Sequence, residues 1–147
     1  MEYMLMPFRR YAEFSGRSGR REFWMFMLLN VIVYCVITVL MMLLGAGASL
    51  QDAAAGNYLA VFGGIGLILL IWALIVLVPG IAVSVRRLHD RDMSGWWYLG
   101  FIVVSIIPLV GFIAAIAYIV VMALPGTPGP NRFGPDPSGA VDPEVFA

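Results

Sequence analysis

Long uncharged apolar stretches dominate the chain. Residues 23–44, 58–85 and 96–124 form three blocks, and none of them contains an Asp, Glu, Lys or Arg residue. Each block exceeds the roughly 20 residues that an α-helix needs to cross the hydrocarbon core of a bilayer. The pattern therefore predicts an all-α integral membrane protein whose transmembrane helical domain covers residues 23–124.

The third block is too long for one straight span. A helix over residues 96–124 would be about 43 Å long, whereas the hydrocarbon core is about 30 Å thick. Pro108 lies near its middle, and proline removes a backbone donor and crowds the preceding turn, so we expect one span kinked at Pro108 and a tail outside the cell. The alternative is a re-entrant hairpin, which gives four helices and an internal tail. Its turn would need protein around it, because lipid cannot satisfy open backbone groups.

Polar segments lie on both sides of this domain. Residues 1–22 form an arginine-rich leader in which Phe8, Tyr11 and Phe14 repeat every three residues. This repeat is compatible with a short helix in the membrane interface, and a disordered leader is the alternative. Residues 125–147 form a Gly- and Pro-rich tail, which indicates turns.

The distribution of arginines predicts the topology. All nine basic residues are arginines, and most of them lie before the first block or between the second and third blocks. The first connection, residues 45–57, has none. Because short basic segments stay in the cytoplasm during insertion, we expect a cytoplasmic N-terminus and an external first connection.

The composition supports a membrane protein with no separate soluble domain. Of the 147 residues, 61% are hydrophobic and only 12% are charged. One small soluble core could not bury so much apolar surface. The formal net charge is zero, and no recognition module for nucleic acid is present.

Three polar segments form a recognisable pattern. They read Phe-Ser-Gly-Arg-Ser-Gly-Arg-Arg-Glu-Phe-Trp at 14–24, Arg-Arg-Leu-His-Asp-Arg-Asp-Met-Ser-Gly-Trp-Trp at 86–97, and Gly-Thr-Pro-Gly-Pro-Asn-Arg-Phe-Gly-Pro-Asp-Pro at 126–137. This series resembles the bacterial membrane family known as domain of unknown function 805, from about Phe14 to Pro137. The resemblance implies a multi-span protein of the bacterial inner (plasma) membrane, and it carries no activity onto particular residues.

The same segments supply a candidate polar cluster. Guanidinium groups bind phosphates in bidentate fashion, and each basic residue near an anionic membrane surface contributes about 1 kcal/mol of attraction. The cluster could therefore bind anionic lipid headgroups or a partner protein. Alternatively, its arginines only set topology and pair with acidic neighbours, which are Glu13, Glu22, Asp90 and Asp92. The cluster comprises Arg17, Arg20, Arg21, Arg86, Arg87, His89, Asp90 and Arg132.

His89 is the one histidine, and Asp90 follows it directly. An adjacent carboxylate can orient an imidazole for proton transfer, but consecutive helix positions do not face each other. We therefore expect His89 to be a structural partner of Arg86, Arg87 or the tail. With Cys35 remote from it, His89 belongs to no recognisable set of metal ligands. We expect no catalytic residue, no metal, no cofactor and no enzymatic activity.

Two further features concern the helices. Aromatic residues typical of the membrane interface are expected at Trp24, Trp96 and Trp97. Small residues recur every four positions at Gly56, Ala60 and Gly64, which predicts a smooth stripe where another helix can approach closely. Packing within the chain is favoured over a dimer interface.

The main functional hypothesis is a non-enzymatic accessory or scaffold subunit of a membrane assembly, which binds another membrane protein or a copy of itself. A second hypothesis is an oligomeric component of a small-solute transporter or channel, with broken helices at Pro79–Gly80 and Pro108 as the places where solute binds. A third is a regulatory membrane protein that binds anionic lipid. No nucleic-acid partner is expected.

Overall fold

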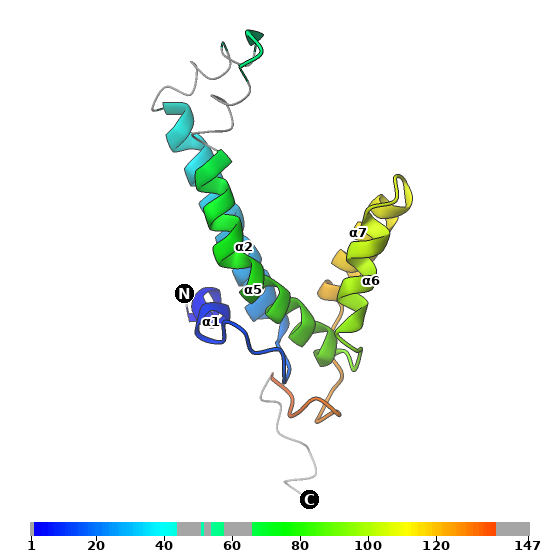
Figure 1. The fold of residues 1–147 in the computed structure, drawn as a ribbon. Helices are drawn as coiled ribbons and strands as arrows, with labels where there is room; N and C mark the ends of the chain where they lie inside the picture. Colours follow the sequence, from blue (N-terminus) through cyan, green and yellow to red (C-terminus); the bar gives the residue numbers. More distant parts are fainter. Residues whose placement is uncertain (1, 44–50, 52–53, 58–65, 138–147) are drawn as a thin grey trace, which may run out of the picture. The chain divides into compact units, whose positions relative to one another are not determined.

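The computed structural model describes residues 2–43, 51, 54–57 and 66–137, and over these residues the chain forms helices and no strand (Figure 1). The helices are α1 (Glu2–Arg9), α2 (Arg20–Leu43), α5 (Leu67–Asp90), α6 (Trp96–Ser105) and α7 (Val110–Ala123). Two of them, α2 and α5, are long and apolar enough to cross a membrane. In the most apolar windows of these two helices only 17% and 22% of the residues are buried. Lipid-facing helices have this pattern, whereas a soluble protein buries such helices.

The chain divides into two compact units. The first contains Met1–Phe26 and Pro79–Ala147, and the second contains Met27–Val78. Helices α2 and α5 each run from one unit into the other. All the members of the candidate polar cluster belong to the first unit.

Helix α5 extends five residues beyond the end of the second apolar block and is not interrupted. Pro79 lies inside it, and the helix continues to Asp90. The predicted discontinuity at Pro79–Gly80 is therefore wrong, and the weakness that a proline introduces is tolerated within the helix. Arg86 and His89 consequently lie on the last turns of α5 and not in a loop.

Left-handed backbone ends α5. Asp92 has φ 58°, and the N–H groups of Asp92 and Met93 donate to the carbonyls of His89 (2.9 Å) and Leu88 (3.0 Å). This arrangement resembles the usual left-handed ending of a helix, and Asp is one of the few residues besides Gly that adopt it readily. It redirects the chain into α6.

The third apolar block forms two helices, so the prediction of a single span kinked at Pro108 is wrong. Helices α6 and α7 pack against each other as an antiparallel hairpin, and Pro108 lies in the turn between them (Figure 1). The hairpin was the alternative interpretation of the sequence. It returns the chain to the polar end of α5, where Arg87 contacts the carbonyl of Met122 near the end of α7.

Close backbone contact makes the hairpin turn possible. A Cβ atom at Gly111 would collide with the carbonyl group of Ser105. The Gly111 N–H donates to the Ile107 carbonyl at 2.7 Å, and Leu109 has φ 67°. The turn thus depends on a residue without a side chain where α7 begins beside the end of α6.

Aromatic packing joins the base of the hairpin to the rest of the first unit. The Tyr118 ring of α7 lies 5.5 Å from the Phe101 ring of α6 and 6.4 Å from the Phe23 ring of α2. Its hydroxyl donates to Ser84 Oγ of α5 at 2.9 Å. Tyr118 therefore contacts α2, α5 and α6.

Two other predictions differ from the structure. The leader forms its helix, α1, over Glu2–Arg9, so Tyr11 and Phe14 lie beyond the end of that helix. Gly56 has φ 80°, which excludes it from a helix and therefore from a helix-packing stripe. Ala60 and Gly64 lie outside the described residues.

Candidate functional site

Three buried arginines and two buried carboxylates occupy the polar end of the first unit. The arginines are Arg17 from the leader and Arg86 and Arg87 from α5, and the carboxylates are Glu22 of α2 and Asp90 of α5. We call these five residues the arginine clamp. Burying a charge is costly unless it is paired and hydrogen-bonded, so each of these buried arginines needs partners within the protein.

Arg17 binds the tail. Its Nε atom donates to Asp90 Oδ1 at 2.9 Å, and its two terminal nitrogens donate to the carbonyls of Gly129 and Thr127, each at 2.6 Å. The tail segment that it contacts is a tight turn closed by two hydrogen bonds between Asn131 and Gly134. A guanidinium group has five donors in a rigid fork, which suits it to bind several carbonyls at once.

Arg86 binds the leader and α2. Its Nη2 atom donates to Glu22 Oε1 at 2.9 Å, and Nη1 donates to the carbonyl of Glu13. Its own carbonyl accepts from the Ser18 N–H at 3.1 Å. Arg86 therefore pairs with Glu22, one of the acidic neighbours named in the alternative interpretation.

Arg87 binds the end of α7. It donates from Nε to the Met122 carbonyl at 3.1 Å and from Nη2 to the Leu124 carbonyl, and it pairs with the Asp90 carboxylate. The last carbonyls of a helix have no partners within it and carry partial negative charge. Arg87 satisfies two carbonyls at this end and holds the end of α7, the returning helix of the hairpin, beside α5.

Asp90 is the shared partner within the clamp. One carboxylate oxygen pairs with Arg17 and the other pairs with Arg87. Its carbonyl accepts from both the N–H (2.8 Å) and the hydroxyl (3.1 Å) of Thr127. A Cβ atom at Gly126 would collide with the carboxylate, which explains why the tail passes here with a glycine.

His89 is a structural partner of the leader and the tail. Its ring is stacked on the Phe133 ring at 3.9 Å, and its Nδ1 atom lies 3.2 Å from the Gly16 carbonyl. Its own carbonyl accepts from Asn131 Nδ2 at 2.9 Å. Of the three partners that the sequence leaves open for His89, these contacts are with the tail, through ring stacking and a backbone carbonyl.

Exposed ion pairs surround the clamp. Arg132 pairs with Asp92 at 3.0 Å, and Arg10 pairs with Glu13 at 2.7 Å. The hydrogen bond from Arg10 lowers the pKa of Glu13, and the same bond raises the pKa of Arg10. A lowered carboxylate pKa means that this pair contributes at neutral pH and that its contribution is lost as the pH falls through the carboxylate range. Because both groups are in contact with solvent, the contribution is small.

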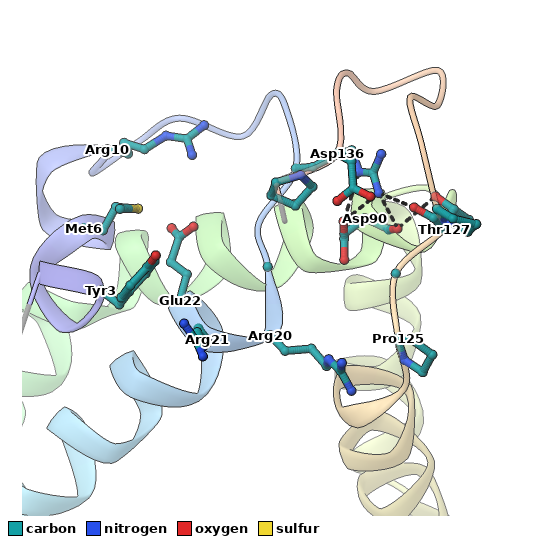
Figure 2. Close-up of a pocket in the computed structure, with 15 residues that line it drawn as sticks. Tyr3, Met6, Arg10, Arg20, Arg21, Glu22, Asp90, Pro125, Thr127 and Asp136 are labelled. Carbon is teal, nitrogen blue, oxygen red and sulfur yellow. Dashed lines mark hydrogen bonds and ion pairs between the residues drawn. The ribbon is translucent and has the colours of Figure 1, made fainter. Parts of the chain in front are cut away.

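A cavity of about 870 Å³ lies beside the clamp, between α1, the start of α2 and the tail (Figure 2). Arg20 and Arg21 line it, and both are exposed. Arg20 extends toward Pro125 in the tail, whereas Arg21 lies on the side of Glu22. The predicted polar cluster is therefore divided: Arg17, Arg86 and Arg87 are buried and bound within the protein, and Arg20 and Arg21 face the cavity.

The three tryptophans that are expected at the membrane interface lie at the starts of helices near this polar end. Trp24 is in the first turns of α2, and Trp96 and Trp97 begin α6; all three are exposed. Their predicted location in the membrane interface stays a prediction.

Sequence reasoning missed several residues of this site. The clamp partners in the tail are Thr127 and Gly129, whereas the sequence pattern indicates only Arg132 there. The polar segment at 126–137, the third of the three polar segments, is the one sequence signal that points to the tail. The segment does not show that Arg17 donates to backbone carbonyls of the tail, those of Thr127 and Gly129, rather than to a charged side chain there.

Comparison with known proteins supports the membrane assignment. A family model described as protein of unknown function matches residues 11–135. The chain is 39% identical to inner membrane protein YhaH and 34% identical to inner membrane protein YhaI, both of Escherichia coli K12, over 93% of this chain and 97% and 96% of the relatives. It is also 33% identical to the Escherichia coli protein YiiR over 84% of each chain.

No solved structure matches the chain. The family match covers residues 11–22 of the leader, helices α2, α5, α6 and α7, and the tail turn, which include every residue of the arginine clamp. The chain is an inner-membrane protein, and it belongs to the family described as protein of unknown function DUF805.

Proposed function

We propose that the protein acts by association, as a non-enzymatic accessory or scaffold subunit of an assembly in the inner membrane. The observation that carries the proposal is the α6–α7 hairpin. Helices of 10 and 14 residues are about 15 Å and 21 Å long, so neither crosses a hydrocarbon core of about 30 Å. A hairpin that enters the membrane and turns within it needs protein around its turn.

The hairpin turn and the adjoining start of α7 carry large apolar side chains. Leu109 is 83% exposed and Phe112 is 72% exposed. At the other end of the hairpin, Arg87 and Tyr118 attach it to α2 and α5. The arrangement suits a rigid apolar element that is held at its base and contacts a partner helix at its tip.

The clamp supports a structural and not a catalytic use of its charged groups. The three buried arginines donate to carboxylates and to carbonyls of the leader, the tail and α7. Groups that are already bound in this way hold segments together, and they are not placed to transfer protons to a substrate.

Photo-crosslinking in native membranes tests the proposal. A photoreactive amino acid at Phe112, in the first turn of α7 next to the hairpin turn, should give a crosslinked product that contains a second polypeptide, either a copy of this chain or another membrane protein. Mass analysis of the product identifies which. The same amino acid at Trp97, at the base of the hairpin, serves as the control and should give mainly lipid adducts. Only lipid or intrachain adducts at Phe112 would contradict the proposal.

A further inference from the structure

Within the described part of the chain, two arginines have no hydrogen-bond or ion-pair partner. Each of the buried arginines, together with Arg10 and Arg132, pairs with a carboxylate. By contrast, Arg20 and Arg21 make no hydrogen bond or ion pair with any residue that the structure describes. They are adjacent, exposed and always charged, so their binding capacity is free.

Both arginines line the cavity of about 870 Å³ (Figure 2). Its wall is completed by Tyr3 and Met6 of α1 and by the tail from Pro125 onward. Cavities of roughly 300–1,000 Å³ are typical of small-molecule sites. The space is large enough for a phosphate group together with the glycerol or sugar that carries it.

The acids in the wall do not neutralise these two arginines. Glu22 is bound to Arg86, and Asp90 is bound to Arg17 and Arg87. The third acid of the wall, Asp136, also has an interaction within the protein. The cavity therefore presents two free guanidinium groups beside carboxylates that are already paired, which favours an anionic ligand.

The position of the cavity also favours an anion. Arg20 and Arg21 belong to the first turn of α2, where free backbone N–H groups add partial positive charge. The exposed Trp24 and the apolar length of α2 follow directly. Charged residues next to an interfacial tryptophan lie at the depth of phospholipid headgroups.

We propose that the cavity binds a phosphate-bearing ligand through Arg20 and Arg21. The phosphate belongs either to an anionic phospholipid headgroup or to a soluble phosphate ester. The site is independent of the proposed association through the hairpin, since it lies at the opposite end of α6 and α7 and uses other residues.

Native mass spectrometry of the full-length protein tests the site. The protein is placed in nanodiscs of phosphatidylcholine with or without phosphatidylglycerol, and the bound phosphatidylglycerol is counted after release. The R20Q/R21Q variant should bind it roughly thirtyfold more weakly, since each basic residue near an anionic lipid contributes about a factor of five. The R9Q/R132Q variant is the matched control: it loses the same charge from two exposed arginines outside the cavity wall and should bind as the wild type does.

A second arm separates the two sources of phosphate. Inorganic phosphate and glycerol 3-phosphate are titrated against the protein in pure phosphatidylcholine nanodiscs. Saturable binding that R20Q/R21Q abolishes, without selective retention of phosphatidylglycerol, assigns the site to a soluble ester; selective retention assigns it to lipid. R20K/R21K keeps the charge and should retain most of the binding. The proposal is overturned if the wild type prefers neither probe, or if R9Q/R132Q weakens binding as much as R20Q/R21Q.

Discussion

At the scale of single residues, the protein buries charged side chains, which costs desolvation free energy. Arg86 and Arg87 are fully buried, and each is compensated by a carboxylate and by backbone carbonyls. A buried ion pair adds little net stability compared with an apolar replacement, but removal of one partner leaves an uncompensated charge. The clamp therefore specifies which segments meet more than it stabilises the fold.

The shared carboxylate of Asp90 is the sharpest test of the clamp. Asp90→Asn removes the negative charge that pairs with Arg17 and Arg87, so we expect a loss of about 3–5 kcal/mol in the free energy of unfolding. Unfolding in mixed detergent micelles, followed by circular dichroism, measures the change. Asp92→Asn removes an equal charge from the exposed pair with Arg132 and should cost less than about 1 kcal/mol. Equal effects of the two substitutions would contradict a structural role for Asp90.

At the scale of the elements, the α6–α7 hairpin depends on the close approach of two helices at its turn. The sequence shows a proline in the middle of a long apolar block, which is compatible with a kink or with a turn. Gly111 lies against the Ser105 carbonyl and so permits the turn, which no periodicity or composition could reveal.

Gly111→Ala tests the hairpin. The added methyl group collides with backbone that cannot move aside as a flexible side chain would, so we expect a loss of about 1–3 kcal/mol in the free energy of unfolding. Gly100→Ala in α6 is the control, because an added Cβ there would have no atom within 4 Å other than those of its chain neighbours and of the backbone of its own helix. Alanine is the better helix former, so that substitution should be neutral or stabilise by up to about 1 kcal/mol. A harmless Gly111→Ala would show that the turn does not require this contact.

At the scale of the whole molecule, the hairpin decides where the tail lies. A single third span would place the leader and tail on opposite sides of the membrane, whereas Arg17 binds the carbonyls of Thr127 and Gly129. We therefore expect the leader and the tail to share one side of the membrane, and the arginine distribution predicts that this side is the cytoplasm.

Cysteine labelling tests this topology. In a chain whose natural cysteine is replaced by Cys35→Ser, the exposed positions Ser15 and Pro135 are changed singly to cysteine. A membrane-impermeant maleimide should label both Ser15→Cys and Pro135→Cys in inverted vesicles and neither in intact spheroplasts. Labelling of the two positions from opposite sides of the membrane would show that Arg17 of the leader does not bind the tail in the membrane.

The amino-acid sequence by itself determined the solvent, the class and the family of this protein. Long uncharged blocks require lipid around them whatever the details of packing, and the three polar segments carry the family pattern. Tertiary structure decided what those polar segments do. The leader, α5 and the tail are brought together by one carboxylate that pairs with two arginines and by backbone carbonyls, which any residue could supply. The arrangement also needs Gly111 and Gly126, because a side chain at either position would collide with a neighbouring group. Such contacts join residues separated by up to 117 positions, and local patterns contain no record of them.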